Sequence, residues 1–246
     1  MKAIILAAGI SVRMGIKTYG VPKPLLKING LSLIEHNVSK LSKFPEISEI
    51  IIVIGYKKEL IINTLGYEYD GLKISYIFNS QYKETNSSFS MWLARDYVTS
   101  SFIVMNGDTL IDERYLDRII NEESDSSVLI DLFFTKFTFE DLKVSIDSDF
   151  KVNNIGKDIL LTEKTYGSPA IYKFQNESVK LLFELIEENF IKKDSLKSLL
   201  SRAIQIFSSK YKVIAISIEE SIFWIDIDTP NDYQDAINYF EKKYKI

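Results

Sequence analysis

Apolar positions in the first half of the chain follow two patterns that alternate along the sequence. Short runs rich in Ile, Val and Leu are typical of buried strands, and the segments between them repeat apolar residues every three to four positions, as amphipathic helices do. These patterns predict strands at residues 2–6, 49–54, 73–77 and 102–105 and helices at residues 32–42, 57–65 and 88–98. Repeated strand–helix–strand units favour an α/β fold with a doubly wound, mostly parallel sheet and helices on both faces.

The pattern changes over residues 127–175, where short β-rich runs follow one another without helical segments between them. Strands expected at 128–134, 143–146, 151–155 and 165–174 would pair antiparallel and form a small insertion. We therefore expect one domain over residues 1–246 that contains this insertion. The remaining pattern predicts helices at 178–189 and 194–208, a β-rich run from 222, and a last helix from Pro230 to about 244.

Composition and charge narrow the classes of protein that fit. The 246 residues are 46% hydrophobic, which suffices for a full core, and the absence of cysteine excludes disulfides, thiolate metal sites and cysteine nucleophiles. A net charge of −4 gives no broad basic surface, so we expect no nucleic-acid partner. No apolar run approaches the about 20 residues of a membrane span, and no leader pattern precedes the first strand. We expect a cytoplasmic protein without a membrane partner; whether it is a homo-oligomer stays open.

A turn of small residues follows the first predicted strand: Leu6, Ala7, Ala8 and Gly9. Such a turn lets main-chain N–H groups approach phosphate oxygens, and Arg13 and Lys23 follow it as two fixed cations. Lys23 lies between two prolines, which predicts an extended loop rather than a helix. The alternative is an ordinary tight turn at Gly9 with both cations solvated.

Acidic residues follow two β-rich runs of the sequence. Asn106-Gly107-Asp108 follows the predicted strand 102–105, and an Asp at the carboxyl end of a parallel strand can bind Mg²⁺. Asp226 and Asp228 close the run that begins at 222, and their spacing places both on one face of a strand. Helix capping is the alternative for Asp108, at a helix that begins near residue 112, and for Asp228, at the last helix.

The N-terminal motifs resemble the nucleotidyltransferase superfamily that makes NDP-sugars and CDP-activated alcohols. Its signature, Leu-Ala-Ala-Gly-x-x-x-Arg-Met followed by Pro-Lys-Pro-Leu, matches residues 6–14 and 22–25 position by position. The resemblance implies a Rossmann-like nucleotidyltransferase fold and a nucleotide site that includes Gly107. It implies catalytic roles for Arg13, Lys23 and Asp108.

The same resemblance implies that Mg²⁺ is the cofactor. The superfamily has a metal-binding Asp after the central strand and a second acidic ligand in a segment similar to the one ending in Thr229-Pro230. Asp108 and Asp226 are thereby implied as metal ligands, with Asp228 competing with Asp226 for the second position.

A polar segment at residues 79–92 joins a predicted strand to a helix, and its amides and hydroxyls can hydrogen bond to a nucleobase or serve as ordinary turn and N-cap groups. This segment resembles the Asn-Asn-x-Tyr-Ser-Leu element of the CTP-dependent phosphocholine cytidylyltransferases. Asn86 and Ser90 match it, Phe89 replaces its Tyr, and Ser87 and Met91 depart from it. The resemblance implies CTP as the nucleotide, bound in part by Asn86 and Ser90.

The acceptor is expected at the antiparallel insertion. Residues 152–159 resemble the segment whose lysine contacts the acceptor phosphate, which implies Lys157, with Lys143 as second candidate and Tyr166 beside them. An exposed hairpin lysine is the alternative. Aromatic rings and carboxylates in the sequence suit a cationic acceptor, and the candidates are Phe89, Trp92, Tyr166, Trp224, Glu84 and Asp131.

Together these motifs predict a transferase that moves CMP from CTP to a small phosphorylated or phosphonylated acceptor of the phosphocholine, aminoethylphosphonate or phosphoamide type, with release of pyrophosphate. A sugar-1-phosphate nucleotidylyltransferase is the main alternative. A non-enzymatic binding subunit would have lost a motif residue, and none is missing. His36, the single histidine, is expected on a helix surface without a catalytic role.

Overall fold

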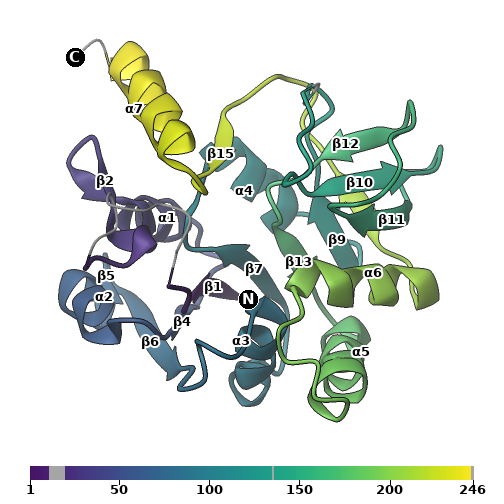
Figure 1. The fold of residues 1–246 in the computed structure, drawn as a ribbon, viewed down its shortest axis with the longest axis horizontal. Coiled ribbons are helices and arrows are strands. Elements are labelled where there is room, and N and C mark those ends of the chain that lie inside the picture. Colours follow the sequence, from purple (N-terminus) through teal and green to yellow (C-terminus); the bar gives the residue numbers. More distant parts are fainter. Residues whose placement is uncertain (11–19, 135, 245–246) are drawn as a thin grey trace.

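The computed structural model describes residues 1–10, 20–134 and 136–244. Its centre is an eight-stranded sheet (Figure 1). In spatial order the strands are β14 (Ile214–Ile216), β9 (Ser126–Leu129), β13 (Tyr172–Phe174), β7 (Phe102–Asn106), β1 (Lys2–Ala7), β4 (Glu49–Ile54), β6 (Leu72–Phe78) and β5 (Glu68–Tyr69). The pairs β14–β9, β7–β1, β1–β4 and β4–β6 are parallel, which confirms the predicted mostly parallel α/β sheet.

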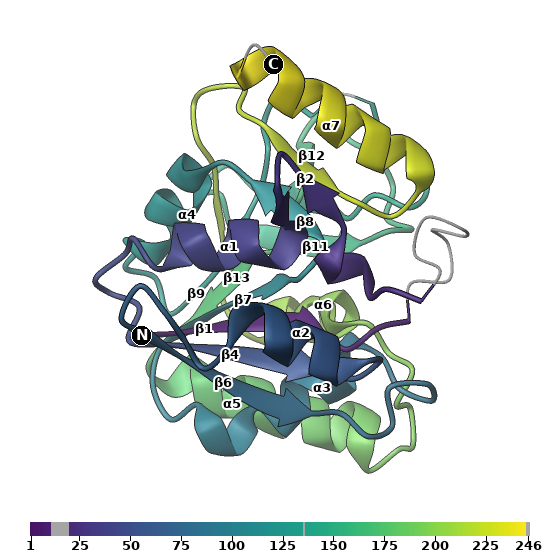
Figure 2. The ribbon, with the colours of Figure 1, turned by 90° about the vertical axis from the view of Figure 1, so that its left-hand side faces the viewer.

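Helices cover both faces of this sheet (Figure 2). One face packs against α1 (Leu33–Leu41), α2 (Lys58–Leu65) and α4 (Glu113–Ile120); the other packs against α3 (Ser87–Leu93), α5 (Glu177–Ile186) and α6 (Leu200–Lys210). Strand β1 shows why both faces of the sheet are covered. Ile4 lies in one core and Ile5 lies in the other, and both are fully buried. Residues that alternate along a strand point to opposite faces.

A separate antiparallel sheet consists of β11 (Val152–Gly156), β10 (Lys143–Ile146) and β12 (Thr165–Gly167). The insertion is therefore smaller than the expected residues 127–175, because β9 and β13 pair within the main sheet. The strand expected at 165–174 is divided by Pro169 and by Ala170, whose φ is +54°. Proline lacks the N–H that a sheet ladder needs, and a positive φ interrupts extended backbone.

Two short strands, β8 (Thr109–Ile111) and β15 (Trp224–Asp226), pair antiparallel and connect the chain after β7 to the C-terminal segment. The hairpin β2 (Lys27–Ile28) and β3 (Leu31–Ser32) lies near the last helix, α7 (Pro230–Tyr244), which begins at the predicted Pro230. A third core under α7 contains Leu110, Ile227 and Phe240. The C-terminal segment is thus tied to the residues that follow β7.

His36 lies in this region, and the prediction of a surface position was wrong. It is 8% exposed, its Nε2 donates to the Ile28 carbonyl at 2.8 Å, and its ring centroid lies 5.1 Å from that of Phe240. Burial lowers the pKa of His36, so a neutral ring is favoured. Helix α7 supplies the cover that the local sequence pattern could not reveal.

Other boundaries differ from the sequence expectations. Helix α3 ends at Leu93 and is followed by a 3₁₀ turn, Arg95–Tyr97, while α5 continues into a π-helical turn, Glu187–Ile191. The helix expected at 194–208 is α6, Leu200–Lys210. Strands β8 and β14 were not predicted.

Within the described residues, no helix combines the length and the apolar character needed to cross a membrane.

Candidate active site

A cavity of about 430 Å³ opens at the carboxyl ends of β1 and β7. Its walls come from the turn after β1, the end of β7, the residues before α3, the start of α6, the loops of the small sheet and the end of β15. Ligands of doubly wound sheets are expected at this edge. The cavity therefore gathers segments that are far apart in the sequence around one place.

The small-residue turn forms one wall of the cavity. Leu6, Ala8 and Gly9 line it, whereas Ala7 points into the core that contains α1. Gly107 lies behind this wall, where its N–H donates to the Leu6 carbonyl at 2.9 Å. A Cβ at Gly107 would lie 3.1 Å from the Ala7 Cβ, so glycine allows the ends of β1 and β7 to pack closely. Gly107 thus shapes the wall without lining it.

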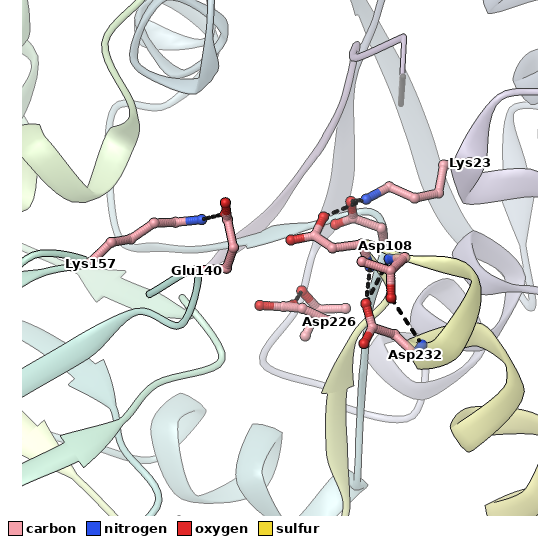
Figure 3. A network of polar contacts seen from close by, with 9 residues as sticks. Lys23, Asp108, Glu140, Lys157, Asp226 and Asp232 are labelled. Atoms are coloured by element: carbon pink, nitrogen blue, oxygen red, sulfur yellow. Dashed lines mark hydrogen bonds and ion pairs between the residues drawn. The ribbon is translucent and has the colours of Figure 1, made fainter. Parts of the chain in front are cut away.

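Lys23 is the buried cation of the cavity. It begins a 3₁₀ turn, Lys23–Leu25, so the expected extended loop was wrong: Pro22 precedes the turn and Pro24 fits within it. The Lys23 side chain is 8% exposed and forms ion pairs with Asp108 and with Asp228, the latter at 2.9 Å (Figure 3). Burial alone would lower the pKa of Lys23, but the two carboxylates outweigh it and raise the pKa above its ordinary value.

Asp226 is brought beside this group by the β8–β15 pair, in which it lies opposite Thr109. The Thr109 hydroxyl donates to the Asp226 carboxyl. Desolvation, followed by the negative charge of Asp108, raises the pKa of Asp226 to about 7. Near neutral pH, Asp226 can therefore gain or lose a proton, or bind a cation in place of the proton.

The structure excludes the two capping alternatives. Asp112 itself caps α4, because its side chain accepts from the Arg114 N–H at 3.1 Å. At the start of α7, the Asp232 side chain accepts from the Thr229 N–H at 2.6 Å, and the Thr229 hydroxyl accepts from the Asp232 N–H at 3.3 Å. This reciprocal pair is a capping box. Asp108 and Asp228 instead face the cavity.

These carboxylates are suited to hold a divalent metal. In the part of the chain that the structure describes, no three His, Cys, Asp or Glu side chains form a ready-made metal site. Mg²⁺ commonly takes one or two carboxylates and completes its ligands with water and phosphate. Here the Lys23 ammonium already stands as a cation between Asp108 and Asp228. The donor set therefore fits Mg²⁺ that is bound together with a phosphate ligand.

The segment before α3 and the first turn of α3 form another wall of the cavity. Asn86 and Ser90 both line the cavity, although the Asn86 side-chain oxygen accepts from the Ser87 N–H at 2.8 Å and thereby caps α3. Asn79, 1% exposed, donates to Ser90 Oγ at 3.1 Å and to Thr85 Oγ1 at 3.0 Å. This network fixes the loop that carries the predicted nucleobase contacts.

Three further lining residues, Leu199, Leu200 and Ser201, were not predicted from the sequence. They lie at the start of α6, and hydrogen bonds tie them to α3. The Leu200 N–H donates to Ser87 Oγ at 2.7 Å, and Ser88 Oγ donates to the Leu199 carbonyl at 2.8 Å. Because these partners are more than a hundred residues apart, no local spacing reveals the contact.

Lys157 lies on the small-sheet side of the cavity, beside Glu140 (Figure 3). Their ion pair measures 3.0 Å, with side-chain exposures of 34% and 43%. Glu140 was not singled out in the sequence, since no motif surrounds it. An exposed pair of this kind contributes little to stability, so its ammonium can change partners.

Lys143 does not take the position expected of an acceptor ligand. It is 4% exposed, does not line the cavity, and donates to the carbonyls of Asp141 at 3.0 Å and Lys157 at 2.6 Å. Lys143 therefore ties together the two loops that carry Glu140 and Lys157. Tyr166 packs against the core and does not line the cavity either.

The expected aromatic and acidic setting for a cationic acceptor is not found around the cavity. Trp224 stacks on Phe134 and donates to Asp131 at 2.9 Å, and Trp92 lies 3.7 Å below the Arg95 guanidinium. None of the proposed group lines the cavity: Phe89, Trp92, Tyr166, Trp224, Glu84 and Asp131. Among the described lining residues the aromatic rings are those of Tyr82 and Tyr172. Arg13 falls outside the described residues, so its role stays a prediction.

A family model described as Nucleotidyl transferase matches residues 2–243. Among curated proteins, the chain is 29% identical over 245 residues to the bifunctional protein GlmU of Methanococcus maripaludis, covering 99% of this chain and 55% of that protein. It is 36% identical over 108 residues to the choline-phosphate cytidylyltransferase of Streptococcus pneumoniae, covering 42% of this chain and 43% of that protein. The chain spans about half the length of the curated relatives it matches.

A solved structure of the CTP:phosphocholine cytidylyltransferase from Streptococcus pneumoniae has a TM-score of 0.81 to this chain. The alignment covers 97% of this chain and 98% of that chain at 21% identity. At this identity the similarity concerns the fold. It agrees with the architecture described above, the main sheet and the small antiparallel sheet together.

Proposed function

The chain belongs to the nucleotidyl transferase family, as its motifs predicted, and on that premise we propose that it transfers CMP from CTP to a small phosphorylated or phosphonylated acceptor. Pyrophosphate is the second product. One observation carries the proposal: the small-residue turn, the Lys23–Asp108–Asp228 cluster and Lys157 line the same cavity. Groups suited to a triphosphate and to a second phosphate therefore face each other.

In the proposed reaction an oxygen of the acceptor phosphate attacks the α-phosphorus of CTP. A new P–O bond forms, the bond from the α-phosphorus to the bridging oxygen breaks, and its electron pair leaves with pyrophosphate. A phosphate oxygen is already anionic near neutral pH, so no general base is needed, and no covalent enzyme intermediate forms. Catalysis then rests on positioning and charge stabilisation.

The lysines and aspartates of the cavity have different roles in the proposed reaction. Lys23, with Arg13 as predicted partner, balances the charge that develops on the leaving pyrophosphate, and Lys157 orients the acceptor phosphate. Asp108, with Asp226 or Asp228, would hold Mg²⁺. When bound, Mg²⁺ would neutralise the α-phosphate and polarise its P–O bonds.

The preference for CTP rests on the segment before α3. Asn86 and Ser90 match the cytidylyltransferase element and line the cavity, and the Asn79 hydrogen bonds tie the loop before α3 to Ser90 in the helix. The alignment with a choline-phosphate cytidylyltransferase supports a cytidine nucleotide and a small phosphorylated acceptor.

A sugar-1-phosphate nucleotidylyltransferase is the second candidate. It is favoured by one observation, that the aromatic and acidic residues expected to bind a cationic acceptor do not line the cavity. Glu140 beside Lys157 is compatible with either acceptor, since a carboxylate can bind an ammonium group or accept from sugar hydroxyls.

Pyrophosphate release tests the proposal. CTP, UTP, dTTP, ATP and GTP are each combined with phosphocholine, 2-aminoethylphosphonate, phosphoamino-acid amides and common sugar-1-phosphates in Mg²⁺ buffer, and Asp108→Asn serves as the inactive control. Turnover that is highest with CTP and a small amine- or amide-bearing acceptor is expected. Turnover restricted to UTP or dTTP with a hexose-1-phosphate would replace the proposal with the second candidate.

A further inference from the structure

Lys23 occupies the place where the divalent metal is expected, and this contact has a functional consequence. We propose that Lys23 is a positioning residue that holds Asp108 and Asp228 together and competes with the metal for them. Lys23 releases both carboxylates only when the triphosphate offers it new oxygen partners. The inference rests on the proposed function, because it assumes that a metal and a triphosphate use this cavity.

The Lys23 ammonium partly neutralises the charge of two carboxylates of the cavity. Its ammonium bridges Asp108 and Asp228, the latter at 2.9 Å, and its side chain is 8% exposed (Figure 3). Asp226, on β15, lies beside the pair. Lys23 therefore places a positive charge between the two carboxylates and offsets the repulsion between them.

The ammonium and a divalent metal cannot share these oxygens in the observed geometry. Mg²⁺ binds carboxylate oxygens at about 2.0–2.1 Å, which places it against an ammonium that already lies within hydrogen-bond distance of the same oxygens. Two cations at such a separation repel strongly in a partly buried site. A metal that binds Asp108 Oδ2 or Asp228 Oδ1 therefore requires Lys23 to withdraw from that carboxylate.

The triphosphate supplies the place to which Lys23 withdraws. The turn formed by Leu6, Ala8 and Gly9 lines the same cavity as the ammonium, so phosphates on that turn come within the side chain's reach. Metal and nucleotide then favour each other's binding through Lys23, in addition to their direct contact. Coupling between two ligands is reciprocal, so each should raise the affinity for the other by the same factor.

Metal affinity without nucleotide tests the competition directly. Mn²⁺ alone is titrated into the wild-type protein, Lys23→Met and Lys157→Met, with free Mn²⁺ followed by electron paramagnetic resonance. Methionine keeps the apolar stem and removes the charge, and Lys157 is a matched control because it also lines the cavity but pairs with Glu140. Lys23→Met is expected to bind Mn²⁺ about fivefold to tenfold more tightly, a typical coupling factor, whereas Lys157→Met should change less than twofold.

The opposite result would overturn the inference: unchanged or weaker Mn²⁺ binding by folded Lys23→Met, as judged by circular dichroism, or an equal gain in Lys157→Met. A second measurement uses the wild-type protein alone. The ¹⁵Nζ signal of Lys23, protected by burial and ion pairing, should shift when excess Mg²⁺ is added and shift again when CTP follows. A Lys23 signal that does not shift when Mg²⁺ is added would show that the metal binds elsewhere.

These outcomes are separable from those of the proposed function. Tighter Mn²⁺ binding by Lys23→Met together with no nucleotidyl transfer by the wild-type protein would refute the proposed reaction and leave the competition intact. Transfer activity with no effect of Lys23→Met on Mn²⁺ affinity would refute the competition and leave the reaction intact.

Discussion

The two lysines among the described lining residues of the cavity differ in how firmly the fold holds them. Lys23 is 8% exposed and bridges two carboxylates, whereas Lys157 is 34% exposed and pairs with one, Glu140. The first stands at the strand ends of the main sheet and the second on a loop of the small sheet. The comparison indicates a rigid side suited to a fixed ligand, the triphosphate, and an adaptable side suited to an acceptor that can differ between relatives.

The largest loss of activity is expected from a substitution of Asp108, on the rigid side. Asp108→Asn should lower kcat by roughly three orders of magnitude, since loss of an anionic metal ligand costs several kcal/mol of transition-state stabilisation. Asp226→Asn should cost nearly as much. Pyrophosphate release in Mg²⁺ buffer measures both, with circular dichroism to confirm folding. Asp112→Asn is the control, because Asp112 caps α4 away from the cavity. Near wild-type kcat in Asp108→Asn would make the metal assignment wrong.

A second test removes the buried cation. Lys23→Ala should lower kcat/KM by about two orders of magnitude, as expected for about 3 kcal/mol of charge stabilisation in the transition state. Lys23→Arg should restore little, because a planar guanidinium does not fit between two carboxylates placed around an ammonium. Unchanged steady-state kinetics of Lys23→Ala would assign this residue to structure alone.

A third test concerns the pH dependence of stability on the rigid side. The folded pKa of Asp226, about 7, lies above its value in an unfolded chain, so the folded state retains a proton that the unfolded state has lost. The free energy of unfolding should therefore fall as pH rises from about 4 to about 7, and this contribution should stay level above pH 7.

Urea unfolding at pH 5 and pH 8 in EDTA measures this effect. The wild-type protein should lose roughly 2 kcal/mol more than Asp226→Asn between the two pH values, after allowance for solvent screening. Parallel losses in the two proteins would mean that Asp226 titrates at its ordinary pKa.

The smallest expected effect falls on the adaptable side. Lys157→Ala should raise the KM for the acceptor about tenfold and leave the KM for the nucleotide and kcat nearly unchanged, since one charge-assisted hydrogen bond contributes about 1.5 kcal/mol. Lys143→Met is the comparison, because its loss should lower the melting temperature by loosening both loops. A fall in kcat for Lys157→Ala as large as that for Lys23→Ala would remove the distinction between the two sides.

The rigid side was largely predictable from the sequence and the adaptable side was not. Apolar runs locate the ends of buried strands, and Asp108 and the turn at Gly9 follow such ends directly. On the small sheet, the resemblance of residues 152–159 placed Lys157 before Lys143, and Lys157 does line the cavity, whereas the burial of Lys143 depends on tertiary packing that the sequence pattern does not encode. Glu140 and Ser201 reach the cavity through packing that no local spacing encodes.

The predicted aromatic acceptor site shows a second limit. Sequence composition supplied rings and carboxylates, but a sheet of this size also needs aromatic residues in its interior. Phe89 is 6% exposed, and the indole N–H of Trp224 donates a hydrogen bond to Asp131. Residue type alone does not separate these two uses, because both favour the same side chains.

The β8–β15 pair joins the proposed metal site to a part of the chain that lies outside the main sheet. Asp226 meets Thr109 across 117 residues of sequence, whereas the eight-stranded sheet is complete once Ile216 has joined it. Every strand of the main sheet and the small-residue turn therefore lie before residue 222, whereas Asp226 and Asp228 lie after it. The proposed metal site is thus completed by a segment outside the main sheet, so a substitution that unpairs β8 from β15 should impair the site and leave the eight-stranded sheet intact.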